Sequence, residues 1–427
     1  MRTFLTIWAG QVVSLIGSGM TGFALGVWIF QNTGEATPLV LVALFDSLPN
    51  FTLSPLVGAL VDRYDRRTLM LIADSGAALV TLSLYLLFSN GLLELWHLYL
   101  AALTTSTLGI FQRLAYQASV AVLVPREHLS RANALVQTAE SFSGIISPIL
   151  GGLLFVAIGI NGIFIVDFVT FLVAAGTLLI VRIPSPKSAE VKRHSLLSDI
   201  RQGFDFLKER NGLVSLALFI AMLNALVSSC AVLITPMLLS FATPQVLGFV
   251  QAASSVGLLL GGIWISVWGG PKRKVLGICL AALGSGLGLA FTGVRQDPIW
   301  IAAGLFIFLF PITLINASIR AIVQTKVPAT MQGRVFSLVF TLARLGVPLG
   351  LLAAGPLADQ VFEPAMRIGG GLAATFVGQV LGVGPGRGIG LMFVLAGLGM
   401  LVVTLFMYSY PRMRLVEKEL PDALVEV

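Results

Sequence analysis

The stretch Gly58–Arg67, GALVDRYDRR, places five charged residues within the six positions from Asp62 to Arg67. Apolar runs flank it on both sides, and only 11% of the 427 residues are charged. Soluble domains usually carry about 25% charged residues. The low charge, together with 56% hydrophobic residues, therefore indicates a lipid environment. So dense a charge cluster between two apolar segments is typical of a short loop at a membrane surface.

Twelve apolar stretches are each long enough for a spanning helix, which needs roughly 20 mostly apolar residues. In lipid every backbone polar group must be bonded within the segment, so we expect helices. An outer-membrane barrel would instead show alternating segments of about ten residues. The predicted fold class is an all-α membrane protein with twelve transmembrane helices. The stretches are 4–30, 38–60, 69–89, 96–121, 133–157, 161–182, 213–240, 244–268, 275–294, 298–323, 334–358 and 387–410.

Lys and Arg residues give the expected topology. They gather after the even-numbered stretches, whereas only Arg295, Arg367 and Arg387 follow the odd-numbered ones. Basic loops stay on the cytoplasmic side, so the arginines of GALVDRYDRR are topology markers and both termini are expected in the cytoplasm. The first stretch follows Met1-Arg2 without a small-residue cleavage site, which favours a retained helix. We expect a multi-pass protein of the cell membrane.

A polar segment, 183–212, divides the twelve stretches into six and six. Its Pro, Ser and Lys content indicates a linker, and its later apolar residues recur at helical spacing, which predicts an amphipathic helix on the inner membrane surface. The predicted domains are an N-terminal bundle at 1–182, this linker, a C-terminal bundle at 213–410 and a cytoplasmic tail at 411–427. Val124-Pro125 and Val327-Pro328 each precede an Arg by the same spacing, which suggests a parallel duplication.

Charged residues inside apolar stretches need a reason, because a charge at the bilayer centre costs about 2.5–3.5 kcal/mol on insertion scales. Asp46 and Asp167 are candidates for proton carriers that face a water-filled cavity, or for carboxylates that bond neighbouring helices. Arg113 and Glu140 are expected to form a buried pair, either a proton-sensitive latch or a fixed structural contact. Asp74 lies near the inner interface and is expected to support the adjoining loop.

Polar side chains at helical spacing predict a substrate cavity. The first stretch carries four of them on one face, at spacings of three, four and three residues. Interhelical hydrogen bonding is the alternative. Arg344 either lines the same cavity or extends toward the inner surface. The cavity candidates are Gln11, Ser14, Ser18, Thr21, Asn224, Ser228 and Arg344.

Enzyme chemistry finds no support in the sequence. The three His residues lie at or beyond the ends of apolar stretches, and Cys230 and Cys279 lie inside them. No metal-ligand cluster, nucleotide-binding loop or catalytic triad spacing is present, and the Gly-rich segment 382–388 lacks the Lys-Ser/Thr of a phosphate loop. We therefore expect no catalytic residue, metal or cofactor. The basic residues are spread among short loops, which argues against nucleic acid as a partner.

These features resemble the major facilitator superfamily. The loop signature of that family, G-x-L-x-D-R-x-x-R-R, is matched here, with Asp65 where many relatives have Gly. This variant, together with LVPREHLSRANAL and GPLADQVFEPAM, resembles the macrolide-efflux and enterobactin-exporter branch. The fifth stretch, SGIISPILGG, resembles the antiporter signature G-x-x-x-G-P-x-x-G-G, with Ser in place of one Gly. The matching residues are Gly58, Leu60, Asp62, Arg63, Arg66 and Arg67 in the loop, and Gly144, Pro148, Gly151 and Gly152 beside Ser147 in the fifth stretch.

The resemblance implies alternating access, in which two six-helix bundles rock about a central cavity. Asp62 is then expected to act in a gating loop, against the positive N-terminal end of the eleventh helix. The implied function is proton-coupled export of an amphiphilic organic compound, such as a macrolide-like drug or a siderophore-like metabolite, by a monomer in the lipid bilayer. Uptake by a symporter or facilitator is one alternative, and a non-transporting receptor or scaffold is another.

Overall fold

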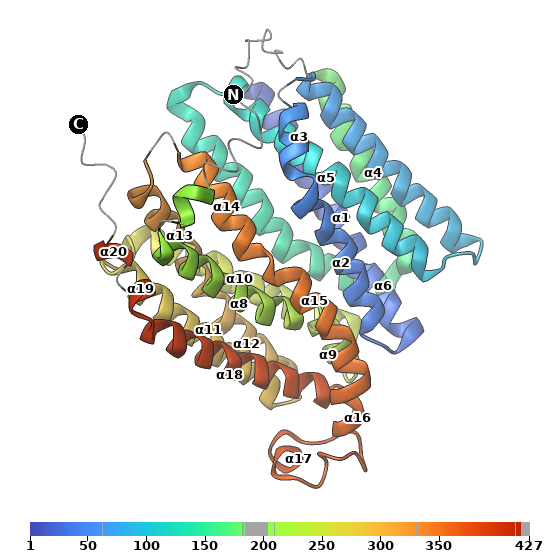
Figure 1. Ribbon diagram of the computed structural model, residues 1–427. Helices are drawn as coiled ribbons and strands as arrows, with labels where there is room; N and C mark the ends of the chain where they lie inside the picture. The colour runs from blue at the N-terminus through green and yellow to red at the C-terminus, as the bar shows by residue number, and fades with distance from the viewer. Residues whose placement is uncertain are drawn as a thin grey trace. The chain divides into compact units, whose positions relative to one another are not determined.

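The computed structural model describes residues 1–61, 63–181, 183, 204–208, 210–328, 331–414 and 416–419. Within these ranges the chain is helical and contains no strand (Figure 1). Nine helical segments of this part are long and apolar enough to cross a membrane. Such segments satisfy their backbone groups internally, as hydrocarbon requires. The fold class is therefore an all-α membrane protein, and its helices are consistent with the predicted twelve crossings.

The chain divides into two compact units. The first unit comprises Met1–Val191 with Ala242–Ala252, and the second comprises Lys192–Phe241 with Ala253–Val427. The predicted division into six and six helices stays a prediction, and most of the predicted linker lies outside the described residues. The helices of the first unit are α1 (Arg2–Thr33), α2 (Thr37–Thr52), α3 (Ser54–Val61), α4 (Arg66–Ser89), α5 (Leu95–Leu123), η1 (Arg126–His128) and α6 (Leu129–Ile180).

The second unit is built from longer helices that are broken into shorter pieces. The helix α10 begins in the segment Ala242–Ala252 of the first unit and continues into the second. The helices are α8 (Asn211–Ala231), α9 (Ile234–Leu239), α10 (Pro244–Trp268), α11 (Lys274–Val294), α12 (Pro298–Leu309), α13 (Ile312–Lys326), α14 (Gln332–Arg344), α15 (Gly346–Pro356), η2 (Leu357–Phe362), α16 (Glu363–Met366), α17 (Phe376–Leu381), α18 (Arg387–Ser409), α19 (Pro411–Arg414) and α20 (Val416–Glu419).

The helix α6 contains two crossings that reverse at a single residue. Gly159 has φ 66° and ψ −178° inside this 52-residue element. A side chain with a Cβ rarely adopts such a positive φ, so glycine allows the reversal without a loop. The sequence prediction of two separate stretches, ending and starting near this residue, agrees with the break.

Contacts with α1 show that the two halves of α6 run in opposite directions. From the N-terminus of α1 onward, its partners in the first half of α6 have increasing residue numbers. Its partners in the second half of α6 have decreasing residue numbers. The pairs are Trp8 with Leu135 and Leu15 with Ser143 in the first half, and Gly10 with Thr177 and Gly17 with Thr170 in the second. The helix α1 thus packs along both crossings of α6.

The predicted tail packs against the second unit in its described part. Val416 is buried, and Glu417 accepts hydrogen bonds from the backbone N–H groups of Lys274 and Val275, at 2.8 and 3.1 Å. These N–H groups belong to the first turn of α11 and would otherwise lack a partner in the helix. Lys326 Nζ donates to the main-chain oxygen of Glu417 at 2.6 Å. The tail therefore joins the adjacent ends of α11 and α13.

The Gly-rich segment before α18, to which the sequence assigned no role, ends in a pair of helix caps. Arg387 is buried and donates to the carbonyls of Gly293 and Val294, at 3.2 and 2.9 Å. These carbonyls lie at the C-terminal end of α11, where a cation is favourable. Glu363 accepts from the N–H of Gly386 and of Ile389 at the start of α18, at 3.1 and 2.9 Å.

Replacing Arg387 should loosen this end of the second unit. In Arg387→Gln the two α11 carbonyls lose a charged donor, and such hydrogen bonds contribute about 1.5–3 kcal/mol. We expect a loss of about 2 kcal/mol of stability, measured as thermal unfolding of the purified protein in detergent. Arg367→Gln is a matched control, because Arg367 is exposed and lies at the start of the same segment. Equal unfolding temperatures of the two variants would contradict the assigned role.

Candidate functional site

Asp167 lies in a buried polar cluster of three helices. Its side chain is 2% exposed and accepts from Ser18 Oγ at 3.3 Å, Thr21 Oγ1 at 2.8 Å and Thr81 Oγ1 at 3.2 Å. The donors come from α1 and α4, and Asp167 comes from the second half of α6. A buried carboxylate needs such donors, because an unsatisfied charge inside a protein is costly. The cluster therefore links three helices of the first unit, and its part in proton transport stays a prediction.

Asp74 forms a second buried cluster, whose donor on α1 lies about two helix turns before those of Asp167. Its side chain is 3% exposed, and its Oδ2 accepts from Gln11 Nε2 at 3.2 Å and from Gln112 Nε2 at 3.4 Å. The expectation that Asp74 supports the adjoining loop is wrong, because both of these partners lie within the helices α1 and α5. Their amide donors reach the carboxylate across the interface of α1, α4 and α5.

The polar stripe on α1 mostly serves these two carboxylates. Gln11 binds Asp74, whereas Ser18 and Thr21 bind Asp167, and Ser14 is buried. This is the interhelical hydrogen bonding that the sequence left open as the alternative. The spacing of the stripe thus indicates the face of α1 that meets α4 and α6. A role for these residues in lining a substrate cavity stays a prediction.

Asp46 belongs to a different, exposed cluster between α2 and α5. Its main-chain oxygen accepts from Ser106 Oγ, which in turn accepts from Asn50 Nδ2 at 3.1 Å. Asn50 Oδ1 accepts from Arg113 Nη2 at 2.9 Å. The carboxylate of Asp46 is exposed and has no hydrogen bond or ion pair within the described ranges. Charged groups at membrane depth usually face a water-filled cavity, so this cluster is the stronger candidate for a transport site.

Two members of this cluster, Asn50 and Ser106, were missed in the sequence. Asn50 follows Asp46 by four residues, which places both on one face of a helix. That spacing could have indicated a shared site with Asp46. An uncharged side chain next to Pro49 is equally typical of a helix end, so the spacing alone did not single out Asn50. Ser106 gave no signal, because only the packing of α5 against α2 brings it to Asp46.

The predicted Arg113–Glu140 pair is not formed. Arg113 binds Asn50, whereas Glu140 Oε2 accepts from Gln137 Nε2 at 3.0 Å on its own helix. Both side chains are exposed, and no ion pair joins them within 4.0 Å among the residues that the structure describes. Each charged side chain instead forms a hydrogen bond with the neutral amide group of a nearby residue. Their participation in proton coupling stays a prediction.

The signature loop begins α4 with a capping carboxylate. Asp65 accepts from the backbone N–H and from the hydroxyl of Thr68, both at 2.8 Å. This contact satisfies an N–H of the first turn and suits the positive end of the helix. Asp62, the predicted gating residue, lies outside the described residues. Gly58 and Arg63 belong to the described part, and Arg63 is exposed.

The two following arginines bind carbonyls of other helices. Arg66 Nη1 donates to the carbonyl of Ala118 in α5 at 2.8 Å. Arg67 donates to the carbonyls of Leu178 and Leu179 at the end of α6, at 2.7 and 2.8 Å. The last carbonyls of a helix have no partner within the helix and attract cations. The loop therefore joins the start of α4 to the body of α5 and to the end of α6.

Removing Arg67 should destabilise the first unit. Arg67→Ala leaves two carbonyls without their charged donor, and we expect a loss of about 2 kcal/mol in stability. Arg67→Lys keeps the charge but cannot reproduce the forked contact, so its effect should be intermediate. Thermal unfolding in detergent measures both. Arg63→Ala is the control on the same loop, and a loss as large in this control would refute the assignment.

The antiporter-like motif on α6 permits close packing against α1. Ser147 Oγ lies 3.0 Å from Ser143 Oγ. A Cβ added to Gly19 of α1 would lie 2.6 Å from Ser147 Cβ, and one added to Gly151 would lie 2.9 Å from the ring of Phe23. Small residues allow helices to approach in this way. The motif thus has a packing role on this face.

The opposite face of the motif meets the start of α10. A Cβ added to Gly152 would lie 2.7 Å from the carbonyl oxygen of Pro244, and one added to Gly248 would overlap the carbonyl oxygen of Pro148. Both α10 residues belong to the segment Ala242–Ala252 of the first unit. Gly144, the first residue of the motif, also belongs to α6. The role of the motif in antiport stays a prediction.

The cavity candidates of the second unit stabilise a break between α14 and α15. Asn224 Nδ2 donates to the carbonyl of Ala343 at 2.8 Å, and Ser228 Oγ donates to that of Val347 at 3.1 Å. Carbonyls near a helix break need such partners. Arg344 is exposed. The structure therefore shows a packing role for Asn224 and Ser228, and their role toward a substrate stays a prediction.

Comparison with known proteins now decides the family. The sequence profile described as the Major Facilitator Superfamily matches residues 7–351. The chain belongs to the Major Facilitator Superfamily. Solved structures agree at the level of the fold. A nucleoside transporter, NupG, has a TM-score of 0.70 at 11% identity and covers 96% of this chain and 100% of its own. A bacterial homologue of the lysosomal transporter Spinster, in an inward-facing, unoccupied conformation, has a TM-score of 0.71 at 14% identity and covers 97% of both chains.

Members of the Major Facilitator Superfamily with curated names include exporters that resemble this chain. Macrolide efflux protein A of Streptococcus pyogenes is 27% identical over 373 residues, which are 84% of this chain and 90% of that protein. Enterobactin exporter EntS of Escherichia coli O81 (strain ED1a) is 25% identical over 391 residues, 88% of this chain and 90% of that protein. The present chain is thus a multi-pass membrane transporter of the superfamily.

Proposed function

We propose that this transporter exports an amphiphilic organic compound in exchange for protons, by alternating access. The names of the similar proteins support export, because one is a macrolide efflux protein and another exports enterobactin. Both names describe bulky organic compounds. A macrolide-like drug or a siderophore-like metabolite is therefore the substrate class that we propose for this chain.

The exposed carboxylate of Asp46 is the observation that carries proton coupling. It lies in the middle of α2, beside a hydrogen-bonded group of Asn50, Ser106 and Arg113. A proton carrier must reach water and must exchange its proton without breaking the fold. The exposed carboxylate of Asp46, which holds no described partner, supports this role. Asp167 is the less favoured carrier, because it is buried and bonds three hydroxyl groups.

The available driving force is sufficient for useful export. A membrane potential supplies about 2.3 kcal/mol per charge per 100 mV, and one pH unit adds about 1.4 kcal/mol per proton. Entry of one proton under both would sustain a substrate gradient of a few hundredfold, because about 1.4 kcal/mol corresponds to a factor of ten.

The experiment begins with a susceptibility screen of host cells with and without the chain, against macrolides and catechol-type iron chelators. The compound with the largest protective effect is then labelled and added to inside-out membrane vesicles. Energised vesicles should accumulate it, and a protonophore should release it. Accumulation in right-side-out vesicles alone would refute export and favour uptake. Accumulation that the protonophore does not reduce would refute proton coupling but would leave the proposal of export in place.

A further inference from the structure

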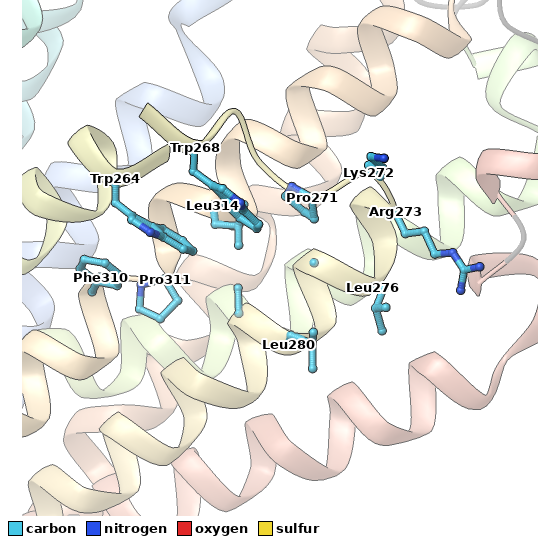
Figure 2. A pocket seen from close by; sticks show the side chains of 12 residues that line it. Trp264, Trp268, Pro271, Lys272, Arg273, Leu276, Leu280, Phe310, Pro311 and Leu314 are labelled. Atoms are coloured by element: carbon cyan, nitrogen blue, oxygen red, sulfur yellow. The ribbon is translucent and has the colours of Figure 1, made fainter. Parts of the chain in front are cut away.

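An apolar pocket of the second unit is lined by none of the side chains considered so far. It has a volume of about 550 Å³ and lies where the end of α10, the start of α11 and the junction of α12 and α13 meet (Figure 2). The rings of Trp264 and Trp268 stack with centroids 4.7 Å apart, and Trp264 also lies 5.5 Å from Phe310. Leu276 and Leu280 of α11 form the facing wall.

The surface around this pocket is apolar. Val267 is 85% exposed and Trp268 is 51% exposed on α10, and Leu280 is 60% exposed on α11. In a chain that spans a membrane, such side chains are expected to meet lipid hydrocarbon. Tryptophan is enriched at the depth where hydrocarbon gives way to headgroups. The pocket thus lies at one edge of the bilayer, where an acyl chain and a headgroup are both within reach.

Two cations stand at the mouth of the pocket. Lys272 and Arg273 line it beside the turn at Gly269 and Gly270, whose positive φ values of 80° and 83° carry the chain from α10 to α11. Both cations are exposed, and no carboxylate lies within 4.0 Å of either in the part of the chain that the structure describes. This leaves an apolar chamber with unpaired positive charge at its rim.

We propose that the pocket binds one anionic phospholipid, with an acyl chain between Trp268 and Leu280 and the phosphate on Lys272 and Arg273. The lining decides between ligand classes. Apart from the two cations and the indole groups it is hydrocarbon, so a sugar or a nucleotide would leave its buried polar groups without partners. A lipid without net negative charge would not neutralise the two cations. Basic groups at a membrane surface favour anionic lipid, and pockets of this type between helices bind anionic headgroups.

The test uses the full chain in detergent and two dibrominated lipids, phosphatidylglycerol and phosphatidylcholine. Bromine quenches tryptophan on contact, and the share of quenching lost in Trp264→Phe/Trp268→Phe reports this pocket. We expect phosphatidylglycerol to bind roughly 20- to 30-fold more tightly than phosphatidylcholine, since each basic residue contributes about fivefold. Lys272→Ser/Arg273→Ser should abolish this preference, and Arg412→Ser/Arg414→Ser, an exposed basic pair of the same unit, should retain it.

Three results would overturn the proposal. These are equal quenching by the two lipids, a preference that survives Lys272→Ser/Arg273→Ser, and quenching that is unchanged in Trp264→Phe/Trp268→Phe. Glycerol 3-phosphate separates a lipid from a soluble phosphate. It should fail to displace the lipid at equal concentration because it lacks an acyl chain, and displacement would assign the cations to a soluble anion. Size-exclusion profiles identical to wild type are required of every variant.

Discussion

Asp46→Asn is expected to reduce the substrate gradient of energised vesicles from a few hundredfold to near unity, a loss of about two orders of magnitude. Asparagine matches aspartate in size but cannot carry the proton. Because the carboxylate accepts no hydrogen bond from another described residue, the fold should be unaffected. Accumulation of labelled substrate and proton movement on substrate addition, followed with a pH-sensitive dye, measure the effect.

Two controls separate coupling from binding. Glu35→Gln removes an exposed carboxylate at the loop between α1 and α2 and should retain the wild-type gradient. Exchange of labelled for unlabelled substrate without a proton gradient should persist in Asp46→Asn, because that process needs the cavity and not the proton. A wild-type gradient in Asp46→Asn would transfer the proton to Glu140 or Asp167 and remove Asp46 from the mechanism.

Gly346→Ala should cause the largest loss of stability. An added Cβ would overlap the carbonyl oxygen of Ala221 on α8, and it would lie 2.8 Å from that carbonyl carbon and 2.9 Å from the amide nitrogen of Ala225. These neighbours are main-chain atoms, which cannot rotate away as a side chain can. The helices α8 and α15 would have to separate, which also threatens the bonds that Asn224 and Ser228 make to the broken helix.

The expected cost is about 4 kcal/mol, or failure to fold, from overpacking together with two weakened hydrogen bonds. Yield of monodisperse protein and its unfolding temperature in detergent measure it. Gly284→Ala is the matched control within the same unit. Its nearest neighbour would be the Pro311 ring carbon at 3.7 Å, and alanine is the better helix former, so stability should hold or rise. Equal behaviour of the two variants would contradict the tight α8–α15 contact.

Local patterns and tertiary contacts contributed differently to the site. The polar stripe of α1 is visible in the sequence, but its partner carboxylates, Asp74 and Asp167, did not follow from it. Arg113 shows the limit most clearly. Two opposite charges on consecutive helices favoured an ion pair with Glu140, whereas the helix orientations bring Arg113 to Asn50. Side-chain direction depends on helix rotation, which hydropathy does not specify.

The sequence by itself determined the solvent, the fold class and the family. Long apolar stretches with few charges can only be satisfied as helices in lipid, and GALVDRYDRR carries a recognisable family signature. Only the tertiary structure decided which partner each polar group takes. It assigned Arg67 to the end of α6, Glu417 to the start of α11, and two tryptophans with two cations to one pocket. The reason is geometric, because hydrogen bonds and pockets depend on a few ångströms between segments distant in the chain.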